Sequence, residues 1–333
     1  MTRRDSFRLL GATGLALVVP QPLLLFAQKN NSMANTEFEV IIIGGSYAGL
    51  STALTLGRSR RKTLLIDAGQ PCNRQTPHSH NFLTQDGSTP KAISDVAKSQ
   101  VAQYPSVHFY SGFANGVKRL QEKFEITTSN GEVFTAKKLV LATGIKDLMP
   151  AISGFAECWG ISVVHCPYCH GYEIRDKNTA IIANGERAFH LATLVINLTS
   201  KLTIITTSKD LFDEHQLKKL KQNNIRIIEN DVSAIQHQNG QLESLIFTDD
   251  TSEQFDCAYA SIPFELHSNI AKSLGCELTE HGHIKVNPMQ KTTVEGVFAC
   301  GDNSSPMRSV AIAVQGGNIT GAMINHEFSQ ESF

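Results

Sequence analysis

The chain lacks an excess of charge of either sign. Its 333 residues carry 30 lysines and arginines against 31 aspartates and glutamates, which gives a formal net charge of −1. Nucleic-acid-binding proteins typically show a basic excess or a basic patch, so the composition gives no support for a nucleic-acid partner. A content of 41% hydrophobic and 18% charged residues is typical of a globular protein, and the length allows about two domains.

Cysteine is scarce as well. Seven cysteines are too few and too scattered for a disulfide scaffold, and the odd number leaves at least one thiol without a partner within the chain. Cys166 and Cys169 nevertheless form a C-x-x-C motif, which by itself can bind a metal, form a structural disulfide or cycle redox equivalents. The other five are expected to be buried bystander thiols: Cys72, Cys158, Cys257, Cys276 and Cys300.

A convincing set of metal ligands is missing. His165 and His170 flank the C-x-x-C motif, but four ligands within six residues would make a cramped tetrahedral site. The sequence contains neither a second C-x-x-C nor an H-x-x-x-H motif. We therefore expect no metal, and we interpret His78 and His80 as loop histidines.

An uninterrupted hydrophobic run of membrane-spanning length is missing too. Pro20-Gln21-Pro22 breaks the apolar stretch near the N-terminus, so no membrane span is expected. Arg3-Arg4, the apolar stretch and Ala27 together resemble a twin-arginine export signal over residues 1–27, which predicts a periplasmic or extracytoplasmic protein. The alternative is translation from Met33, which predicts a cytoplasmic protein.

A dinucleotide-binding pattern is present near the start of the chain. A continuous apolar run over residues 38–43 predicts a buried parallel strand, and a glycine-rich turn then leads into a helix over residues 50–56. In that turn Gly44 permits the tight bend, Gly49 permits close packing of helix on strand, and the Ser46 hydroxyl can bond a phosphate. A second strand ends at Asp67, where a carboxylate would accept hydrogen bonds from ribose hydroxyls.

A second unit of this kind is expected in the middle of the chain, with strands over residues 180–182 and 202–205 and a helix over residues 190–198. Its fingerprint is damaged, because Ala183 and Ala188 stand at glycine positions and only Gly185 keeps its place. Residues 206–210 also lack the arginines that would pair with the 2′-phosphate of NADPH. Binding of NAD(P)H is therefore weakened rather than excluded.

Four motifs, in this order, carry a family resemblance: Gly44 to Gly49, Ala142-Thr143-Gly144, Cys166 to His170, and Phe298-Ala299-Cys300-Gly301-Asp302. The chain resembles the low-molecular-weight thioredoxin reductases, which are FAD-dependent pyridine nucleotide-disulfide oxidoreductases. Its Cys-Pro-Tyr-Cys-His-Gly run is similar to the branch that includes the dithiol oxidases of fungal epidithio toxin pathways. The resemblance implies a homodimer.

The implied fold class is α/β, with two Rossmann-like dinucleotide-binding domains, the second inserted into the first. Residues 36–150 and 276–330 would form a discontinuous FAD-binding domain. Residues 151–275 would form an NAD(P)-binding-like domain that carries the redox dithiol.

The resemblance also implies how FAD is held. An aspartate would hold the ribityl chain, a threonine-glycine loop would close over the cofactor, and backbone groups near the C-terminal helix would lie beneath the isoalloxazine ring. The residues expected to bind FAD are Gly44, Ser46, Gly49, Asp67, Asn81, Thr143, Gly144, Gly301, Asp302, Ser309 and Val310.

The catalytic residues implied are Cys166, Cys169 and His170. By resemblance, Cys169 faces the flavin and Cys166 exchanges with the substrate. His170 stands where thioredoxin reductases carry an acid–base aspartate. Imidazole titrates near neutral pH, so it can take a proton from a thiol and return it.

The direction of electron flow stays open at this point. The damaged second fingerprint and the expected export favour oxidation of a dithiol, with FAD passing electrons to oxygen or another acceptor. The alternative is NAD(P)H-dependent reduction of a disulfide, with a small dithiol or a thioredoxin-like protein as partner in either case. A non-catalytic flavin-stabilised protein is a third hypothesis, and the intact cysteine pair argues against it.

Overall fold

The computed structural model describes residues 36–333. The expected export signal at residues 1–27 and Met33 lie outside the described residues. Two largely parallel sheets organise the described part of the chain, as expected for a doubly wound α/β architecture. Within residues 36–333, no helix combines the length and apolar character needed to cross a membrane.

The first sheet contains the predicted glycine-turn unit. Its order is β3-β2-β1-β6-β5-β4, and β17 pairs with β6. Val40, Ile41 and Ile42 are fully buried, as a central parallel strand requires. The strands are β1 (Glu37–Ile43), β2 (Thr63–Asp67), β3 (Val107–Ser111), β4 (Ala114–Leu120), β5 (Lys123–Thr128), β6 (Val133–Leu141) and β17 (Val297–Ala299).

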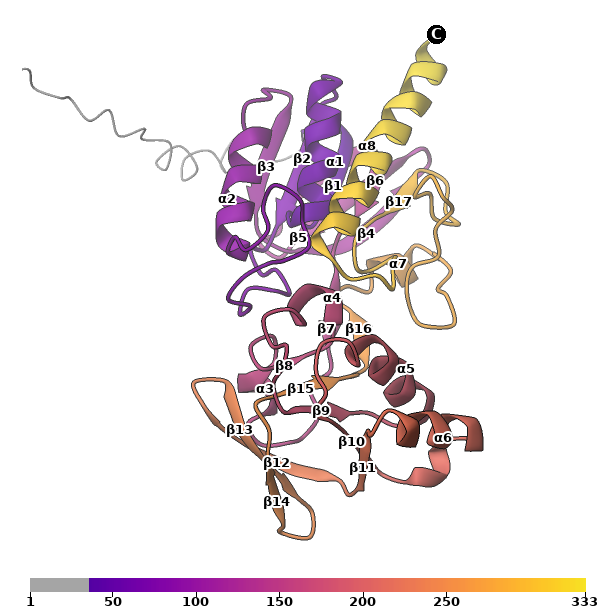
Figure 1. Ribbon diagram of the computed structural model, residues 1–333. Helices are drawn as coiled ribbons and strands as arrows, with labels where there is room; N and C mark the ends of the chain where they lie inside the picture. Colours follow the sequence, from indigo (N-terminus) through magenta and orange to yellow (C-terminus); the bar gives the residue numbers. More distant parts are fainter. Residues whose placement is uncertain (1–35) are drawn as a thin grey trace, which may run out of the picture. The chain divides into compact units, whose positions relative to one another are not determined.

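Helices α1 (Tyr47–Arg58), α2 (Pro90–Val101) and α8 (Val310–Ser332) belong to this first lobe. Helix α1 is longer than the predicted 50–56, because it begins directly after Ser46 in the turn. Helices α1 and α8 lie side by side, and hydroxyl groups of α1 bond the backbone of α8 (Figure 1). Ser51 Oγ donates to Val314 O at 2.7 Å and Thr52 Oγ1 to Gly317 O at 3.0 Å.

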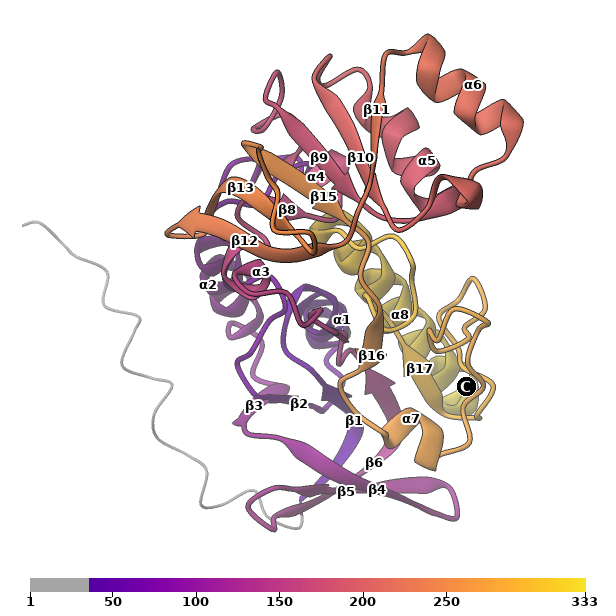
Figure 2. The same ribbon diagram turned by 90° about the horizontal axis from the view of Figure 1, so that it is seen from below.

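The second sheet has the order β11-β10-β9-β15-β8 and is parallel throughout. The β12–β14 sheet lies over one face of this sheet and α5 over the other (Figure 2). Successive side chains point to opposite faces: Ala180 packs in the cluster with Ile235 and Leu245, and Ile181 packs in the cluster with Leu191 and Val195. The elements are β8 (Val163–Val164), β9 (Thr179–Ile182), α5 (Gly185–Val195), β10 (Leu202–Thr206), η1 (Lys209–Leu211), α6 (Glu214–Gln222), β11 (Arg226–Glu229), β12 (Val232–Gln238), β13 (Gln241–Phe247), β14 (Ser252–Gln254) and β15 (Cys257–Ala260).

The middle lobe is inserted into the first, as predicted. The chain leaves the first sheet after β6 and returns to it through β17. At the crossing β7 (Ile145–Asp147) pairs antiparallel with β16 (Phe264–Leu266). The domain boundaries expected at 150/151 and 275/276 stay predictions. Three short helices complete the chain: α3 (Phe155–Cys158), α4 (Pro167–His170) and α7 (Ile270–Ser273).

Candidate functional site

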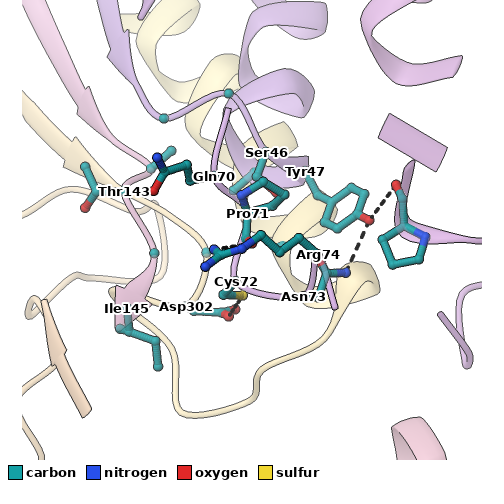
Figure 3. Close-up of a pocket in the computed structure, with 18 of the residues that line it drawn as sticks. Ser46, Tyr47, Gln70, Pro71, Cys72, Asn73, Arg74, Thr143, Ile145 and Asp302 are labelled. Atoms are coloured by element: carbon teal, nitrogen blue, oxygen red, sulfur yellow. Dashed lines mark hydrogen bonds between the residues drawn. The ribbon is translucent and has the colours of Figure 1, made fainter. Parts of the chain in front are cut away.

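A large cavity of about 950 Å³ brings the predicted motifs together. Its wall includes the β1–α1 turn, the loop after β2 and the loop after β6 (Figure 3). The start of α8 and the end of α4 complete it. Most of the predicted residues line it: Gly44, Ser46, Asp67, Thr143, Gly144, Cys169, His170, Gly301, Asp302, Ser309 and Val310. Gly49, Asn81 and Cys166 do not line it.

The β1–α1 turn has the shape that close approach of a phosphate requires. Gly44 has a φ of +106°, and a Cβ on it would lie 2.1 Å from Ala142 O. A Cβ on Gly49 would lie 1.8 Å from Gly44 O, so Gly49 acts through packing rather than by touching a ligand. Only glycine fits both positions. Ser46 begins α1 without a side-chain cap, and the first turn of the helix carries no acidic residue, so its N–H groups are available to an anion.

Asp67 stands at the end of β2, as predicted. Its Oδ1 accepts the backbone N–H of Gly45 at 3.1 Å, and its Oδ2 lies 3.7 Å from Lys98 Nζ. The bond to Gly45 holds the carboxylate beside the glycine turn. Asp67 also lines the cavity, where its carboxylate can accept hydrogen bonds from ribose hydroxyls.

Asp302 belongs to a buried charge network that the sequence motifs did not reveal. Arg308 donates both Nη groups to Asp147, at 2.8 and 3.1 Å, and its Nε lies 3.7 Å from Asp302 Oδ2. Trp159 Nε1 donates to Asp147 at 3.1 Å. Burial raises the pKa of the Asp302 carboxyl, and the Arg308 guanidinium opposes this rise. The sequence could have drawn attention to Arg308 only because it is the last arginine and directly precedes Ser309, a predicted FAD-binding residue.

Some buried polar atoms of this cavity have no hydrogen-bond partner within the described protein. Arg308 and Ser79 line the cavity, and the buried Nε of Arg308 and Oγ of Ser79 have no hydrogen-bond partner among residues 36–333. Buried polar groups are normally paired, so these orphaned atoms suit a polar ligand. Together with the glycine turn and Asp67, they fit the pyrophosphate, ribose and ribityl parts of FAD.

Cys72 was expected to be buried, and this prediction was wrong. It lies in the loop after β2, is exposed toward the cavity, and its Sγ is 3.7 Å from Asp302 Oδ2. No motif in the sequence indicates that this loop opens onto a cavity. Although Cys72 faces the cavity, the protein atoms packed around its sulfur desolvate the thiolate, and together with the Asp302 carboxylate they raise the pKa of this thiol to about 12. Cys158, Cys257, Cys276 and Cys300 are buried, as predicted.

Asn81 lies beside the cavity rather than on its wall. It has a left-handed φ of 59° and donates its backbone N–H to Asp86 Oδ1 at 2.7 Å. This turn points its neighbours Ser79 and His80 toward the cavity instead. The segment is therefore near the site, as expected, but through different residues.

The C-x-x-C motif begins the short helix α4. All seven cysteines are free thiols here, so the pair is in its dithiol form. Cys169 faces the cavity and its Sγ lies 3.8 Å from Arg308 O, whereas Cys166 caps the helix. A hydrogen bond from the Cys169 thiol and N–H groups of the helix start lower the pKa of Cys166 to about 7, against the effect of burial. The neighbouring Cys166 thiolate, together with burial, raises the pKa of Cys169.

Two histidines flank the dithiol and have different surroundings. Burial lowers the pKa of His165 to about 3, so this ring, stacked on Trp159, stays neutral. Burial also lowers the pKa of His170, but the Glu173 carboxylate opposes this. Both ring nitrogens of His170 are buried and lack a hydrogen-bond partner among the described residues. The ring nitrogens of His170 are therefore not engaged by any other side chain of the described residues, and its acid–base role stays a prediction. No cluster of three or more metal-ligating side chains is found in residues 36–333.

The second dinucleotide unit has a smaller cavity, of about 370 Å³, at the end of its sheet. Asn184 precedes α5, and its Oδ1 accepts from Thr206 Oγ1 at 2.8 Å and from the Thr207 N–H at 2.9 Å. Glu186 lies in the first turn of α5 and accepts Gln216 Nε2 at 2.5 Å. Helix α5 starts at Gly185, earlier than the predicted 190, because the turn is shorter than expected.

The family follows from the match between this chain and known sequences. The model of the pyridine nucleotide-disulphide oxidoreductase family matches residues 38–317. The chain belongs to this family. Thioredoxin reductase tcpT of Claviceps purpurea is 30% identical over 299 residues, covering 86% of this chain and 92% of that protein. Thioredoxin reductase sirT of Leptosphaeria maculans is 30% identical over 307 residues, covering 87% and 94%.

Solved structures agree with the fold. An oxidoreductase from Agrobacterium tumefaciens is 36% identical, with a TM-score of 0.83, covering 88% of this chain and 99% of that one. HlmI is 27% identical, with a TM-score of 0.84, covering 89% and 94%. The predicted resemblance is confirmed: the protein is a thioredoxin reductase-like, flavin-dependent disulfide oxidoreductase that binds FAD.

Proposed function

We propose that the protein is a dithiol oxidase, which takes two electrons from an external dithiol through Cys166 and Cys169. The substrate would be a small dithiol or a thioredoxin-like protein, and oxygen or another acceptor would receive the electrons. The proposal goes beyond family membership, which leaves the direction of electron flow open.

The main support for the proposal is that the second dinucleotide unit is poorly suited to bind NADPH. At the start of α5, where a pyrophosphate would bind, Glu186 places a negative charge in the first helical turn. An acidic side chain there competes with an anionic ligand for the helix N-terminus. The Asn184 side chain ties the strand ends together, and Lys209, the one basic residue expected after β10, is paired with Glu229 at 2.6 Å. These contacts disfavour NADPH.

Oxidation of the substrate dithiol by the Cys166–Cys169 disulfide needs no nicotinamide cofactor. A substrate thiolate attacks Cys166 Sγ of the Cys166–Cys169 disulfide, so the S–S bond breaks, a mixed disulfide forms, and Cys169 leaves as a thiolate. His170 then takes the proton of the second substrate thiol. That thiolate attacks the substrate sulfur of the mixed disulfide, which releases the substrate disulfide and the Cys166 thiolate.

The reduced pair must then be reoxidised. FAD, when bound, accepts two electrons from a dithiol and passes them to an acceptor. The position of Cys169 on the cavity wall suits this transfer, which restores the Cys166–Cys169 bond. Dioxygen with two electrons and the two protons of the substrate gives hydrogen peroxide.

The test is anaerobic. The purified holoenzyme is mixed separately with NADPH, NADH and dithiothreitol while the flavin absorbance is followed. We expect bleaching by dithiothreitol alone, with colour restored and peroxide formed in air. Cys169→Ser should keep FAD and lose bleaching, whereas Cys276→Ser, a buried thiol elsewhere, should behave as wild type. Rapid bleaching by NADPH or NADH would replace the proposal with its alternative.

That alternative, an NAD(P)H-dependent disulfide reductase, is favoured by one observation. Arg187 lines the second cavity and could pair with a phosphate. The names of the fungal relatives point the same way, since both are called thioredoxin reductases.

We further propose export through the Arg3-Arg4 signal and assembly as a homodimer. Export would suit oxidase chemistry, because an exported enzyme meets no NADPH pool. Translation from Met33 would instead keep the protein in the cytoplasm.

A further inference from the structure

Asp147 lies at the crossing between the two lobes and binds a residue of each. Arg308 of the first lobe donates from Nη1 to Oδ1 at 2.8 Å and from Nη2 to Oδ2 at 3.1 Å. Trp159 of the inserted lobe donates from Nε1 to Oδ2 at 3.1 Å. The Asp147 side chain is only 9% exposed. A buried carboxylate that accepts three such bonds holds both partners in one geometry.

The two partners of Asp147 reach opposite ends of the dithiol turn. The backbone oxygen of Arg308 accepts a hydrogen bond from Cys169 Sγ at 3.8 Å. The ring of Trp159 stacks on His165, with ring centroids 5.8 Å apart, and His165 directly precedes the C-x-x-C motif. Contacts therefore join one carboxylate to both ends of the C-x-x-C turn.

These contacts lie on the wall of the large cavity. Ser309 follows Arg308 and caps α8, since its hydroxyl accepts the N–H of Ile312 at 3.2 Å. Asp147 and the helix cap thus hold consecutive residues of the segment that Cys169 contacts. By the family resemblance, this segment lies beneath the flavin ring. The residues of the two contact chains that line the cavity are Asp147, Trp159, His165, Cys169 and Arg308.

Two other polar contacts near the dithiol are longer. Glu173 Oε1 lies 3.6 Å from His80 Nε2, and Asp302 Oδ2 lies 3.7 Å from Arg308 Nε. Both distances exceed the length of a hydrogen bond. Of these three carboxylates, only Asp147 is hydrogen-bonded to residues of both lobes within residues 36–333.

We propose that Asp147 and Trp159 are positioning residues that keep Cys169 on the wall of the FAD cavity. They act through Arg308, whose backbone Cys169 contacts. The role concerns the step in which the Cys166–Cys169 bond forms and two electrons pass to FAD. It does not concern exchange of Cys166 with the substrate, because Cys166 does not line the cavity. The proposal rests on the dithiol–flavin transfer used in the proposed function, but it holds for either direction of electron flow.

The first measurement needs no turnover. The reduced holoenzyme is labelled anaerobically with iodoacetamide at pH 8, and each cysteine is followed by mass spectrometry. Asp147→Asn removes the negative charge, and Trp159→Phe removes the N–H donor without changing any charge. Glu39→Gln is the matched control, because it breaks a carboxylate pair with Arg61 at 3.0 Å that lies outside the cavity wall. We expect Cys169 to be labelled on the order of fivefold faster in the first two variants only.

Another buried thiol of the chain serves as an internal control. Cys276 should stay slowly labelled in every variant, because it lies outside the contact chains. Faster labelling of Cys276 together with Cys169 would indicate general loosening and contradict a positioning role. Unchanged labelling of Cys169 in Trp159→Phe would overturn the proposal, since that variant leaves the charges around the thiol as they are. These outcomes do not depend on whether a dithiol substrate is oxidised.

The second measurement separates the two steps of flavin reduction. Oxidised holoenzyme is mixed anaerobically with increasing dithiothreitol. The slope at low concentration reports exchange at Cys166, and the limiting rate of bleaching reports transfer to the flavin. We expect the limiting rate to fall about tenfold in Asp147→Asn and about threefold in Trp159→Phe, with the slope unchanged. An unchanged limiting rate, or an equal fall in the slope, contradicts the positioning role. No bleaching of the wild type would count against the proposed dithiol oxidation, and the labelling result would still decide the role of Asp147.

Discussion

At the residue scale, the two thiols of the C-x-x-C motif are unequal. Cys166 caps α4 and receives hydrogen bonds that favour its thiolate, whereas Cys169 keeps its proton. A low thiol pKa at the outer position suits exchange with a substrate, because Cys166 departs as a thiolate when the mixed disulfide is resolved. This asymmetry agrees with the roles that the family resemblance implied.

We therefore predict selective alkylation of Cys166 in the reduced enzyme. Because the pKa of Cys166 is lowered to about 7, the thiolate fraction should rise as pH increases through 7. Iodoacetamide labelling from pH 5 to 9, read by mass spectrometry, should show a midpoint near 7 at Cys166 and slow labelling at Cys169. A midpoint near the ordinary thiol range of about 8.5 would contradict this reading.

At the element scale, the C-terminal helix α8 runs from the large cavity to a pair of ionic contacts with the first sheet. Its first residue, Val310, lines the large cavity. Near its last turns, Glu327 and Glu331 bind Lys138 of β6, at 2.5 and 2.8 Å, and the Lys138 side chain is only 6% exposed. A buried ammonium needs its partners, so this contact ties the end of the helix to the sheet that carries the site.

Loss of the buried partner should cost stability. We expect Glu327→Gln to lower the free energy of unfolding by about 2 kcal/mol, because Lys138 would then rely on the exposed Glu331. Glu331→Gln is the matched control and should cost less than about 1 kcal/mol, since Glu331 is 56% exposed. Thermal unfolding read by flavin fluorescence compares the two. Equal losses would show that burial of the pair does not matter.

At the scale of the whole molecule, the inserted middle lobe supplies the dithiol and the first lobe supplies the cavity. Cys169 meets the backbone of Arg308, and Arg308 binds Asp147 at the crossing into the middle lobe. The site therefore exists only after both sheets have formed. The proposed export through a twin-arginine signal would therefore have to follow folding.

We predict that export of the full chain depends on Arg3 and Arg4. Changing Arg3 and Arg4 to lysine should leave the flavin content unchanged and retain the protein in the cytoplasm. Cell fractionation of the natural host checks it, with a variant starting at Met33 as the cytoplasmic control. Equal export of the double-lysine variant would remove the twin-arginine interpretation.

The sequence by itself determined the parts that depend on near neighbours. Glycine spacing from Gly44 to Gly49, the apolar strand runs and the C-x-x-C motif are local patterns, so the fold, the cofactor class and the dithiol were predictable. The damage at Ala183 was visible for the same reason. The prediction that Asn81 lies at the FAD site was only approximately right, because a left-handed turn directs its neighbours toward the cavity instead.

Only the tertiary structure decided the contacts between distant residues. Asp147 and Arg308 are 161 positions apart, and Cys72 reaches Asp302 across 230. His80 meets Glu173 in the same way. No periodicity or spacing encodes such pairs, because they form only when two separately wound sheets and their loops close around one cavity.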